Sequence, residues 1–329
     1  MNGRAEIDSS TAVFLIPGQG ADPRGALAQL HRAASGVRSE IDGVLAEIEG
    51  ASGAAGRGLR DYLLTETGDS TPGPGLPQIA NYAISVVLNN VLGTVGVRPR
   101  AVVGQSFGEI AALVCAGVLD TADGARAVCA LNAAFRGFEG RGAMVLVNAS
   151  VRDTRALLDE VGHPKLVVAC VNTPQQTIVS GPTDAIAALL SAPTERKLLE
   201  LPVPYASHHP DLVVVAERFL EGIRRIRQHP LRVPVHSPVR RRAYTDADDL
   251  HVALADCVIK PVHLPETLRD VGAHTPTTFI DLGAGDTLAR CAAVTIPGTR
   301  TIAPLAGDIS WLTGAEIQQA VDAGSRQRS

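Results

Sequence analysis

Over the first third of the chain, short apolar runs typical of strands alternate with longer stretches in which apolar residues recur with a helical period. Apolar runs of strand length occupy 12–16 and 100–103, and each leads into a glycine-containing turn. The stretch 51–77 is rich in Gly, Pro, Ser and Thr, which predicts irregular structure. Helical patterns lie around these segments, a loose one at 25–46 and two firmer ones at 79–92 and 109–116. Strands that alternate with helices predict an α/β domain.

From residue 143 onward the predicted strands and helices are shorter and follow a different order. They read strand, helix, strand, strand, helix, strand, at 143–148, 151–161, 166–171, 176–180, 183–190 and 197–203. This is the ferredoxin-like order. The larger pattern then resumes with a helix at 213–228 and strands at 233–237 and 279–282, and the tail 324–329 is expected to be frayed. We therefore predict a large α/β-hydrolase-like domain, residues 1–138 and 206–329, with an inserted ferredoxin-like small subdomain, residues 139–205.

Composition narrows the choice of function mainly by exclusion. The chain has 329 residues, 30 Lys and Arg against 34 Asp and Glu, and 3% aromatic residues, so we expect neither nucleic acid nor a membrane surface as partner. No apolar run reaches the roughly 20 residues of a bilayer span, and residues 1–10 lack a signal-peptide pattern. The five cysteines are scattered and no metal-ligand spacing occurs. We expect a cytoplasmic protein without bound metal or cofactor.

The motif G-x-S-x-G at 104–108 lies between an apolar strand and a helix. A serine on such a sharp turn points its hydroxyl out of the sheet, and the N-terminal N–H groups of the next helix lie beside a reacting carbonyl. The alternative is an ordinary turn serine. The strand before Ser106 and the helix after it favour a nucleophile.

A serine nucleophile needs a base, and the chain has nine histidines. The pair His208 and His209 lies where the small subdomain returns to the large domain, and a cleft between domains is a common place for a site. Position along the chain therefore favours this pair, without deciding between its two members.

Six motifs follow one another between residues 12 and 295. They read F-L-I-P-G-Q-G at 14–20, G-Q-S-F-G-E at 104–109, G-R-G-A-M at 140–144, Asn172 with V-S-G at 179–181, L-P-V-P-Y-A-S-H at 201–208 and D-L-G-A-G at 281–285. In this order they resemble the malonyl-CoA:acyl-carrier-protein transacylase family. Gln105 stands where that family usually has His, and His209 stands where relatives have Ser.

The resemblance implies a two-step transfer of an acyl group between phosphopantetheine thioesters. Ser106 would form the acyl-enzyme and His208 would act as its base, with acyl carrier protein as acceptor. The family orients its histidine by a backbone carbonyl, which by position would lie near His263. The remaining residues that the resemblance assigns are the oxyanion-hole N–H groups of Gln19 and Phe107 and the substrate-facing residues Gln105, Leu131, Asn132, Asn172, Tyr205 and Ser207.

The chain departs from the malonyl-using relatives at one position. They carry an Arg that pairs with the free carboxylate of the substrate, whereas alignment places Leu131 here, or Asn132 if the register slips by one. An unpaired carboxylate is costly to desolvate, so a neutral or apolar acyl group should be preferred. We expect an acyl group without a free carboxylate, such as an aminoacyl or other starter unit. Similar enzymes of macrolactam pathways take aminoacyl groups from carrier proteins, which suggests a carrier-protein donor, with acyl-CoA as the other possibility.

Other functions remain open to the sequence. They are a malonyl- or methylmalonyl-CoA transacylase, a hydrolase that clears stalled carrier proteins, and an inactive docking module. Carrier proteins are acidic, so a docking face should be basic. The candidates for that face are Arg152, Arg155, Arg300 and the run Arg240, Arg241 and Arg242.

Overall fold

Two β-sheets organise the computed structural model, which describes residues 8–19, 21–33, 35–66, 72–273, 277–307 and Leu312. The tail predicted to be frayed, 324–329, lies outside these ranges. The six-stranded sheet has the order β11-β10-β1-β2-β7-β8, and only the β7–β8 pair is antiparallel. Its strands are β1 (Ala12–Ile16), β2 (Ala101–Gly104), β7 (Val235–Ser237), β8 (Arg242–Ala243), β10 (Thr278–Asp281) and β11 (Arg300–Ile302).

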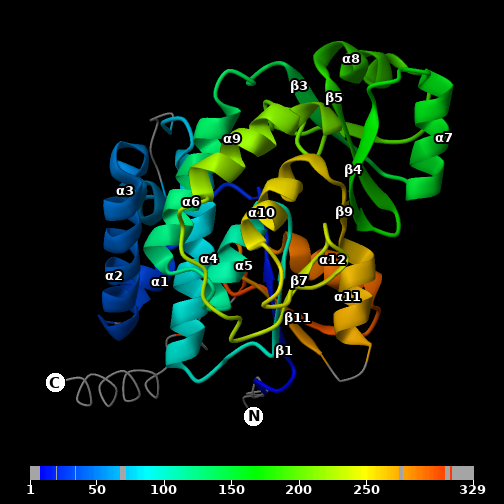
Figure 1. Cartoon of the computed structure of the whole chain (residues 1–329). Coiled ribbons are helices and arrows are strands. Elements are labelled where there is room, and N and C mark those ends of the chain that lie inside the picture. The colour runs from blue at the N-terminus through cyan, green and yellow to red at the C-terminus, as the bar shows by residue number, and fades with distance from the viewer. Residues whose placement is uncertain are drawn as a thin grey trace.

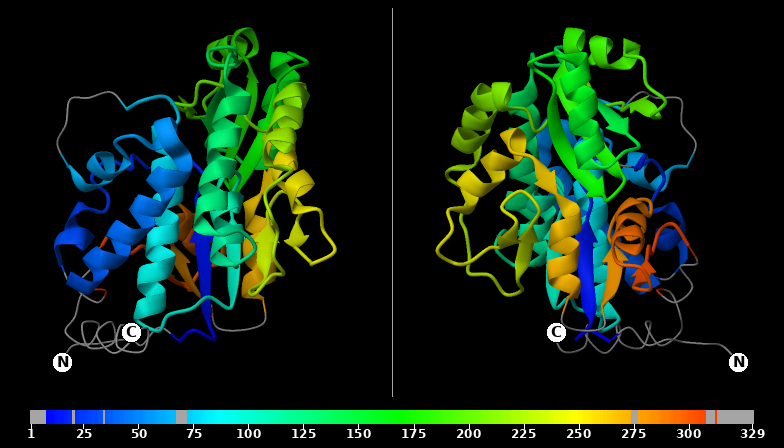
Figure 2. Two further views of the ribbon diagram at one scale, coloured as in Figure 1. Left: turned by 60° about the vertical axis from the view of Figure 1, so that its left-hand side comes forward. Right: turned by 90° about the vertical axis from the view of Figure 1, so that its right-hand side faces the viewer.

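Side-chain alternation along the buried strands divides the interior into two cores, as the period of a strand requires. Phe14 and Ile16 of β1 pack with α4 (Leu76–Thr94) and α5 (Gly108–Cys115). Val13 and Leu15 point the other way, toward α11 (Leu264–Gly272) and α12 (Thr287–Thr295). Helices thus cover both faces of the sheet (Figure 2).

Further helices extend the first core away from the sheet. α2 (Ser35–Ser52) packs on α4 and α6 (Thr121–Phe135), and it forms the left edge of the molecule in Figure 1 together with α1 (Ala28–Ala33) and α3 (Leu59–Leu64). α9 (Val213–Ile223) bridges α6 and α10 (Leu250–Ile259). The helix α3 and the short 3₁₀ helix Gly53–Gly56 correct the prediction of irregular structure over 51–77, because Leu59, Tyr62 and Leu63 are buried against this core.

The second sheet and the helices on it contain the six elements predicted for the middle of the chain, in the predicted order. They are β3 (Gly142–Val147), α7 (Val151–Val161), β4 (Val167–Thr173), β5 (Gln176–Pro182), α8 (Thr183–Ser191) and β6 (Leu198–Glu200). Val145 and Val147 face α7 and α8, whereas Met144 faces the core under α11 and α12. One face of this sheet therefore completes the interior of the larger part of the molecule (Figure 1).

A strand from outside the predicted small subdomain, 139–205, joins the second sheet. β9 (Val262–His263) pairs in parallel with β4, so the sheet order is β6-β3-β5-β4-β9. The structure confirms a mixed α/β fold with two sheets, while the likeness of the larger sheet to α/β-hydrolases remains a prediction. In the described part of the chain, no helix combines the length and apolar character needed to cross a bilayer.

Candidate active site

Ser106 occupies a sharp turn between β2 and α5, with a φ of 56°. Residues other than glycine rarely adopt this left-handed conformation, and where they do the surrounding structure must hold it. Gly104 allows the turn to be this tight, because a Cβ there would lie 2.7 Å from the Cα of Glu109. The sequence therefore builds an elbow that aims the hydroxyl away from the sheet.

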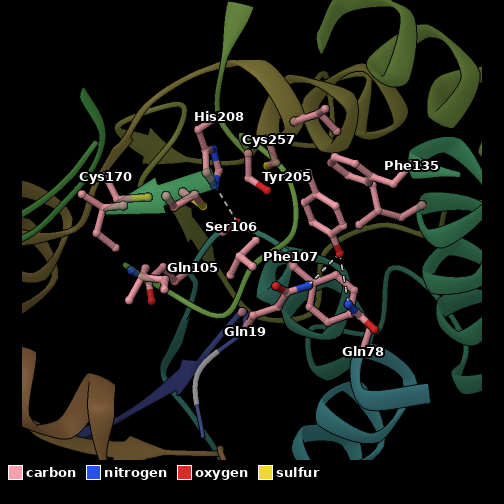
Figure 3. Close-up of a pocket in the computed structure, with 18 of the residues that line it drawn as sticks. Gln19, Gln78, Gln105, Ser106, Phe107, Phe135, Cys170, Tyr205, His208 and Cys257 are labelled. Atoms are coloured by element: carbon pink, nitrogen blue, oxygen red, sulfur yellow. Dashed lines mark hydrogen bonds between the residues drawn. The ribbon is translucent and has the colours of Figure 1, made fainter. Parts of the chain in front are cut away.

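His208 contacts Ser106 directly (Figure 3). The Ser106 hydroxyl donates to Nε2 of His208 over 2.7 Å, and Nδ1 of His208 lies 2.8 Å from the carbonyl oxygen of Lys260. A carbonyl can only accept, so the proton lies on Nδ1 and Nε2 is free to take the serine proton. Burial lowers the pKa of His208 to about 4, although the Lys260 carbonyl opposes this shift. The imidazole is therefore neutral at pH 7.

The predicted orienting carbonyl of His263 is wrong, because that of Lys260 holds the ring. α10 ends at Ile259, and the carbonyls at a helix end have no partner within the helix. The carbonyl of His263 instead accepts the hydroxyl of Thr267 at the start of α11.

The choice between the two adjacent histidines is clear in the structure. His209 is also buried, but Nε2 donates to the carbonyl of Lys165 over 2.9 Å. Its Nδ1 accepts the N–H of Asp211 over 3.1 Å. Both nitrogens of His209 are thus occupied, and His208 is the one that faces Ser106.

Two backbone N–H groups beside Ser106 have no hydrogen-bond partner among the described residues. They belong to Gln19 and Phe107, the pair predicted for an oxyanion hole, and both residues line the same cavity. The loops that carry them pack tightly, since a Cβ on Gly18 would lie 2.9 Å from the carbonyl oxygen of Gln105. Such free donors can stabilise a negative oxygen that forms next to Ser106.

Ser106 and His208 open into a cavity of about 150 Å³ between the two sheets. Most of its wall is apolar, and includes Ile110, Leu131, Met144, Ile178, Phe219 and Leu254. Among the described residues that line it, none is Lys or Arg. Leu131 and Asn132 both reach the cavity, but the Asn132 amide donates to the carbonyl of Gly75 and so also fixes the start of α4.

The other predicted substrate-facing residues all line the cavity: Gln105, Asn172, Tyr205 and Ser207. Nε2 of Gln105 donates to Oδ1 of Asn172 over 2.8 Å, which connects the serine turn to β4. The Tyr205 hydroxyl accepts from Gln19 and from Gln78, and its ring stacks on Phe135 (Figure 3). Gln78 lies in the first turn of α4 and was missed from the sequence, because the apolar pattern that predicted this helix begins only at residue 79.

A buried carboxyl lies behind the serine turn. Glu109, in the first turn of α5, accepts hydrogen bonds from the hydroxyls of Ser237 and Tyr244. Burial raises its pKa to about 7, although both hydroxyls oppose this shift. Glu109 therefore connects α5 to β7 and to the segment after β8, which the sequence did not indicate.

The candidate docking arginines lie in different places. Arg152 and Arg155 are exposed on α7. Arg300 lies at the amino end of β11, whereas Ser106 follows the carboxyl end of the parallel strand β2, so the two lie at opposite ends of the strands. The run at 240–242 is committed to ion pairs, with Asp256, Glu266 and Asp248 respectively.

Comparison with known proteins gives the same family from sequence. The acyl transferase domain profile matches residues 13–307. Erythronolide synthase EryA2 of Saccharopolyspora erythraea is 32% identical over 251 residues, 74% of this chain and 7% of that protein. The spectinabilin polyketide synthase system protein NorA' of Streptomyces orinoci is 34% identical over 293 residues, 87% of this chain and 8% of that protein. The chain thus spans less than a tenth of the length of these relatives.

Solved structures resemble the chain over almost its whole length. The acyltransferase domain from the second module of the salinomycin polyketide synthase is 28% identical with a TM-score of 0.80, over 96% of this chain and 77% of that one. A loading acyltransferase from the avermectin modular polyketide synthase is 25% identical with a TM-score of 0.79, over 97% and 100%. The malonyl-CoA:acyl carrier protein transacylase of Coxiella burnetii, at 22% identity, shares the fold with a TM-score of 0.81 over 95% and 97%.

Proposed function

The chain belongs to the acyl transferase domain family, and on that premise we propose that it moves an acyl group, through an ester on Ser106, onto the phosphopantetheine thiol of an acyl carrier protein. The observation that carries the proposal is the 2.7 Å hydrogen bond between Ser106 and a neutral, buried His208. Two further observations support it: the N–H groups of Gln19 and Phe107, which have no partner among the described residues, and relatives named as polyketide synthases. The activity would therefore serve polyketide biosynthesis.

The chemistry needs no group beyond those of the chain, the donor thioester and the acceptor thiol. Oγ of Ser106 attacks the thioester carbonyl while its proton passes to Nε2 of His208. The N–H groups of Gln19 and Phe107 stabilise the oxyanion, the carbon–sulfur bond breaks, and the leaving sulfur takes the proton from His208. The acceptor thiol then repeats these steps in reverse and frees Ser106.

The acyl group that suits this cavity carries no free carboxylate. A carboxylate taken from water into an apolar cavity needs a cation or several donors, and the described lining supplies no Lys or Arg. Leu131 adds apolar surface where malonyl-using relatives would have a cation. We infer a neutral or aminoacyl starter-type group, delivered by a carrier protein.

A second candidate is a malonyl- or methylmalonyl-CoA transacylase, because several proteins of the same fold are named as malonyl transacylases. In that case a polar group other than Lys or Arg would hold the carboxylate. Gln78 and Asn132 are among the polar side chains that line the cavity.

Intact mass of the purified protein distinguishes the two candidates. The protein is mixed with malonyl-CoA or with a carrier protein bearing a neutral acyl group, and Ser106→Ala serves as control. We expect a mass gain with the neutral donor only, absent from Ser106→Ala. A prompt gain with malonyl-CoA contradicts the neutral-acyl proposal. Release of free acid, rather than transfer to a second carrier protein, indicates the hydrolase.

A further inference from the structure

The backbone of His208 is held in a strained conformation. Its φ is 60°, so both members of the reacting pair have left-handed backbones. For a residue other than glycine this conformation persists only where neighbouring contacts impose it. On the amino side the N–H of His208 donates to the carbonyl of Val258 over 2.8 Å, and the ring is held by Lys260. On the carboxyl side the next residue, His209, forms two hydrogen bonds through its ring.

The His209 ring joins the turn after His208 to the second sheet. Nδ1 accepts the N–H of Asp211, and the Nε2 proton is donated to the carbonyl of Lys165, just before β4. The Lys165 ammonium also pairs with Asp211 over 2.9 Å. A serine could accept the Asp211 N–H as a helix cap, but it is too short to reach the Lys165 carbonyl as well. His209 is 3% exposed, so neither bond exchanges readily with water.

We propose that His209 is a positioning residue, which anchors the carboxyl side of His208 to the Lys165 carbonyl and thereby keeps Nε2 of His208 against Ser106. The inference rests on the proposed function only in taking Ser106 and His208 as the reacting pair. When the anchor is lost, the turn relaxes toward an ordinary backbone and His208 withdraws from Ser106. The effect falls on the rate of the serine reaction and not on binding.

Two substitutions separate the two bonds of His209. In His209→Gln, Nε2 of the amide replaces Nε2 of the imidazole, so the bond to Lys165 is kept and the cap on Asp211 is lost. In His209→Asn, Oδ1 replaces Nδ1, so the cap is kept and the bond to Lys165 is lost. His251→Asn is the matched control, because Nε2 of His251 donates to the carbonyl of Ile226 over 2.9 Å in the same way, outside the cavity.

The rate is measured with phenylmethylsulfonyl fluoride, which makes the test independent of the natural acyl group. Oγ of Ser106 forms a bond to sulfur, the sulfur–fluorine bond breaks, fluoride leaves, and the serine proton passes through His208 to water. Intact mass follows the reaction over time. We expect His209→Asn to react about tenfold more slowly or worse, and His209→Gln and His251→Asn to stay within about threefold of wild type.

A second readout separates positioning from loss of stability. The two His→Asn variants each lose one histidine–carbonyl bond, so their thermal midpoints should fall by similar amounts. Only in His209→Asn should the pH at which the rate falls to half rise above about 4, because a released His208 is exposed to water and its pKa rises toward the ordinary value. Equal rates for His209→Asn and wild type, or a slower His209→Gln than His209→Asn, overturn the proposal. A wild-type protein that does not react at Ser106 overturns the proposed function instead.

Discussion

Burial of one imidazole sets the pH range over which Ser106 can react. His208 must be neutral to accept the serine proton, and burial lowers its pKa from 6.5 to about 4. As pH falls the rate of acylation should therefore hold through pH 6 and decline only near pH 4. Rapid quenching and intact mass give this rate from pH 3.5 to 8, with circular dichroism to exclude unfolding. A midpoint near 6.5 would mean that His208 is solvated in the working enzyme.

Replacing Leu131 by Arg tests whether the absence of a cation at this position is what disfavours an acyl group with a free carboxylate. An Arg at this position of α6 reaches the cavity and can pair with a substrate carboxylate, a contact that contributes about 1.5–3 kcal/mol. We expect Leu131→Arg to raise the rate of malonyl loading by about tenfold or more and to slow neutral acyl loading. Ala133→Arg is the control, since Ala133 lies on the same helix but is exposed. Equal malonyl loading by the two variants contradicts the role given to Leu131.

Single residues differ in how well the sequence predicts them. Ser106 and the pair His208 and His209 are side chains of a reactive type at places where the pattern changes, so the sequence indicates the serine and the pair, and the structure selects His208. The Lys260 carbonyl has no such signal, because every residue has a carbonyl and only the end of α10 leaves this one free. Gln78 belongs to an apolar helix, and only the fold brings its amide to Tyr205.

The helix after Ser106 is fixed by Glu109, and this should appear in the pH dependence of stability. The pKa of the Glu109 carboxyl is raised from 4.5 to about 7 in the folded state. The stability that its neutral form contributes is therefore fully present below pH 4.5 and is lost as pH rises through 7. Relative to Glu109→Gln, the wild type should lose on the order of 3 kcal/mol of unfolding free energy across this window. Urea unfolding at several pH values measures the difference in unfolding free energy between the two proteins. The contributions of His208 and Asp281 cancel in it, because both proteins contain these groups. Parallel curves for the two proteins would show that Glu109 does not titrate there.

The elements that the sequence predicted are those with a clear period. β1 and α7 match their predicted bounds, since one is an apolar run and the other has a strongly one-sided pattern. α10 was missed because apolar residues occur on all its sides, with both α9 and the cavity as neighbours. β9 has two residues and exists only because β4 is there to pair with it. Pairing between distant segments has no local signal.

The cavity depends on the way in which the two sheets meet. β4 holds β9 on one side and presents Asn172 to Gln105 beside Ser106. β3 and β4 both pair with Thr177 of β5 near their carboxyl ends, so these two ends lie at the same end of the second sheet. α7 follows the carboxyl end of β3, which places Arg152 at the edge of the second sheet that faces the serine turn.

This placement ranks the arginines for carrier-protein docking. An acidic carrier must bring its phosphopantetheine thiol to Ser106. Arg152 lies at the end of the second sheet that is near Ser106, whereas Arg300 lies at the far end of the strands of the other sheet. Charges at the rim of an interface mainly change the association rate and its salt dependence. We therefore expect Arg152→Glu to raise the KM for the acyl carrier protein about fivefold, with kcat nearly unchanged. Arg300→Glu should change it much less.

The control for this prediction is a donor without a carrier protein. A small acyl thioester has no acidic surface, so Arg152→Glu should acylate from it at the wild-type rate. The wild-type KM for the carrier should also rise with salt, and this rise should be smaller in Arg152→Glu because one rim cation has become an anion. An equal loss with both donors would indicate damage to the cavity. A larger effect in Arg300→Glu would place the carrier on the opposite side of the molecule and remove α7 from the docking surface.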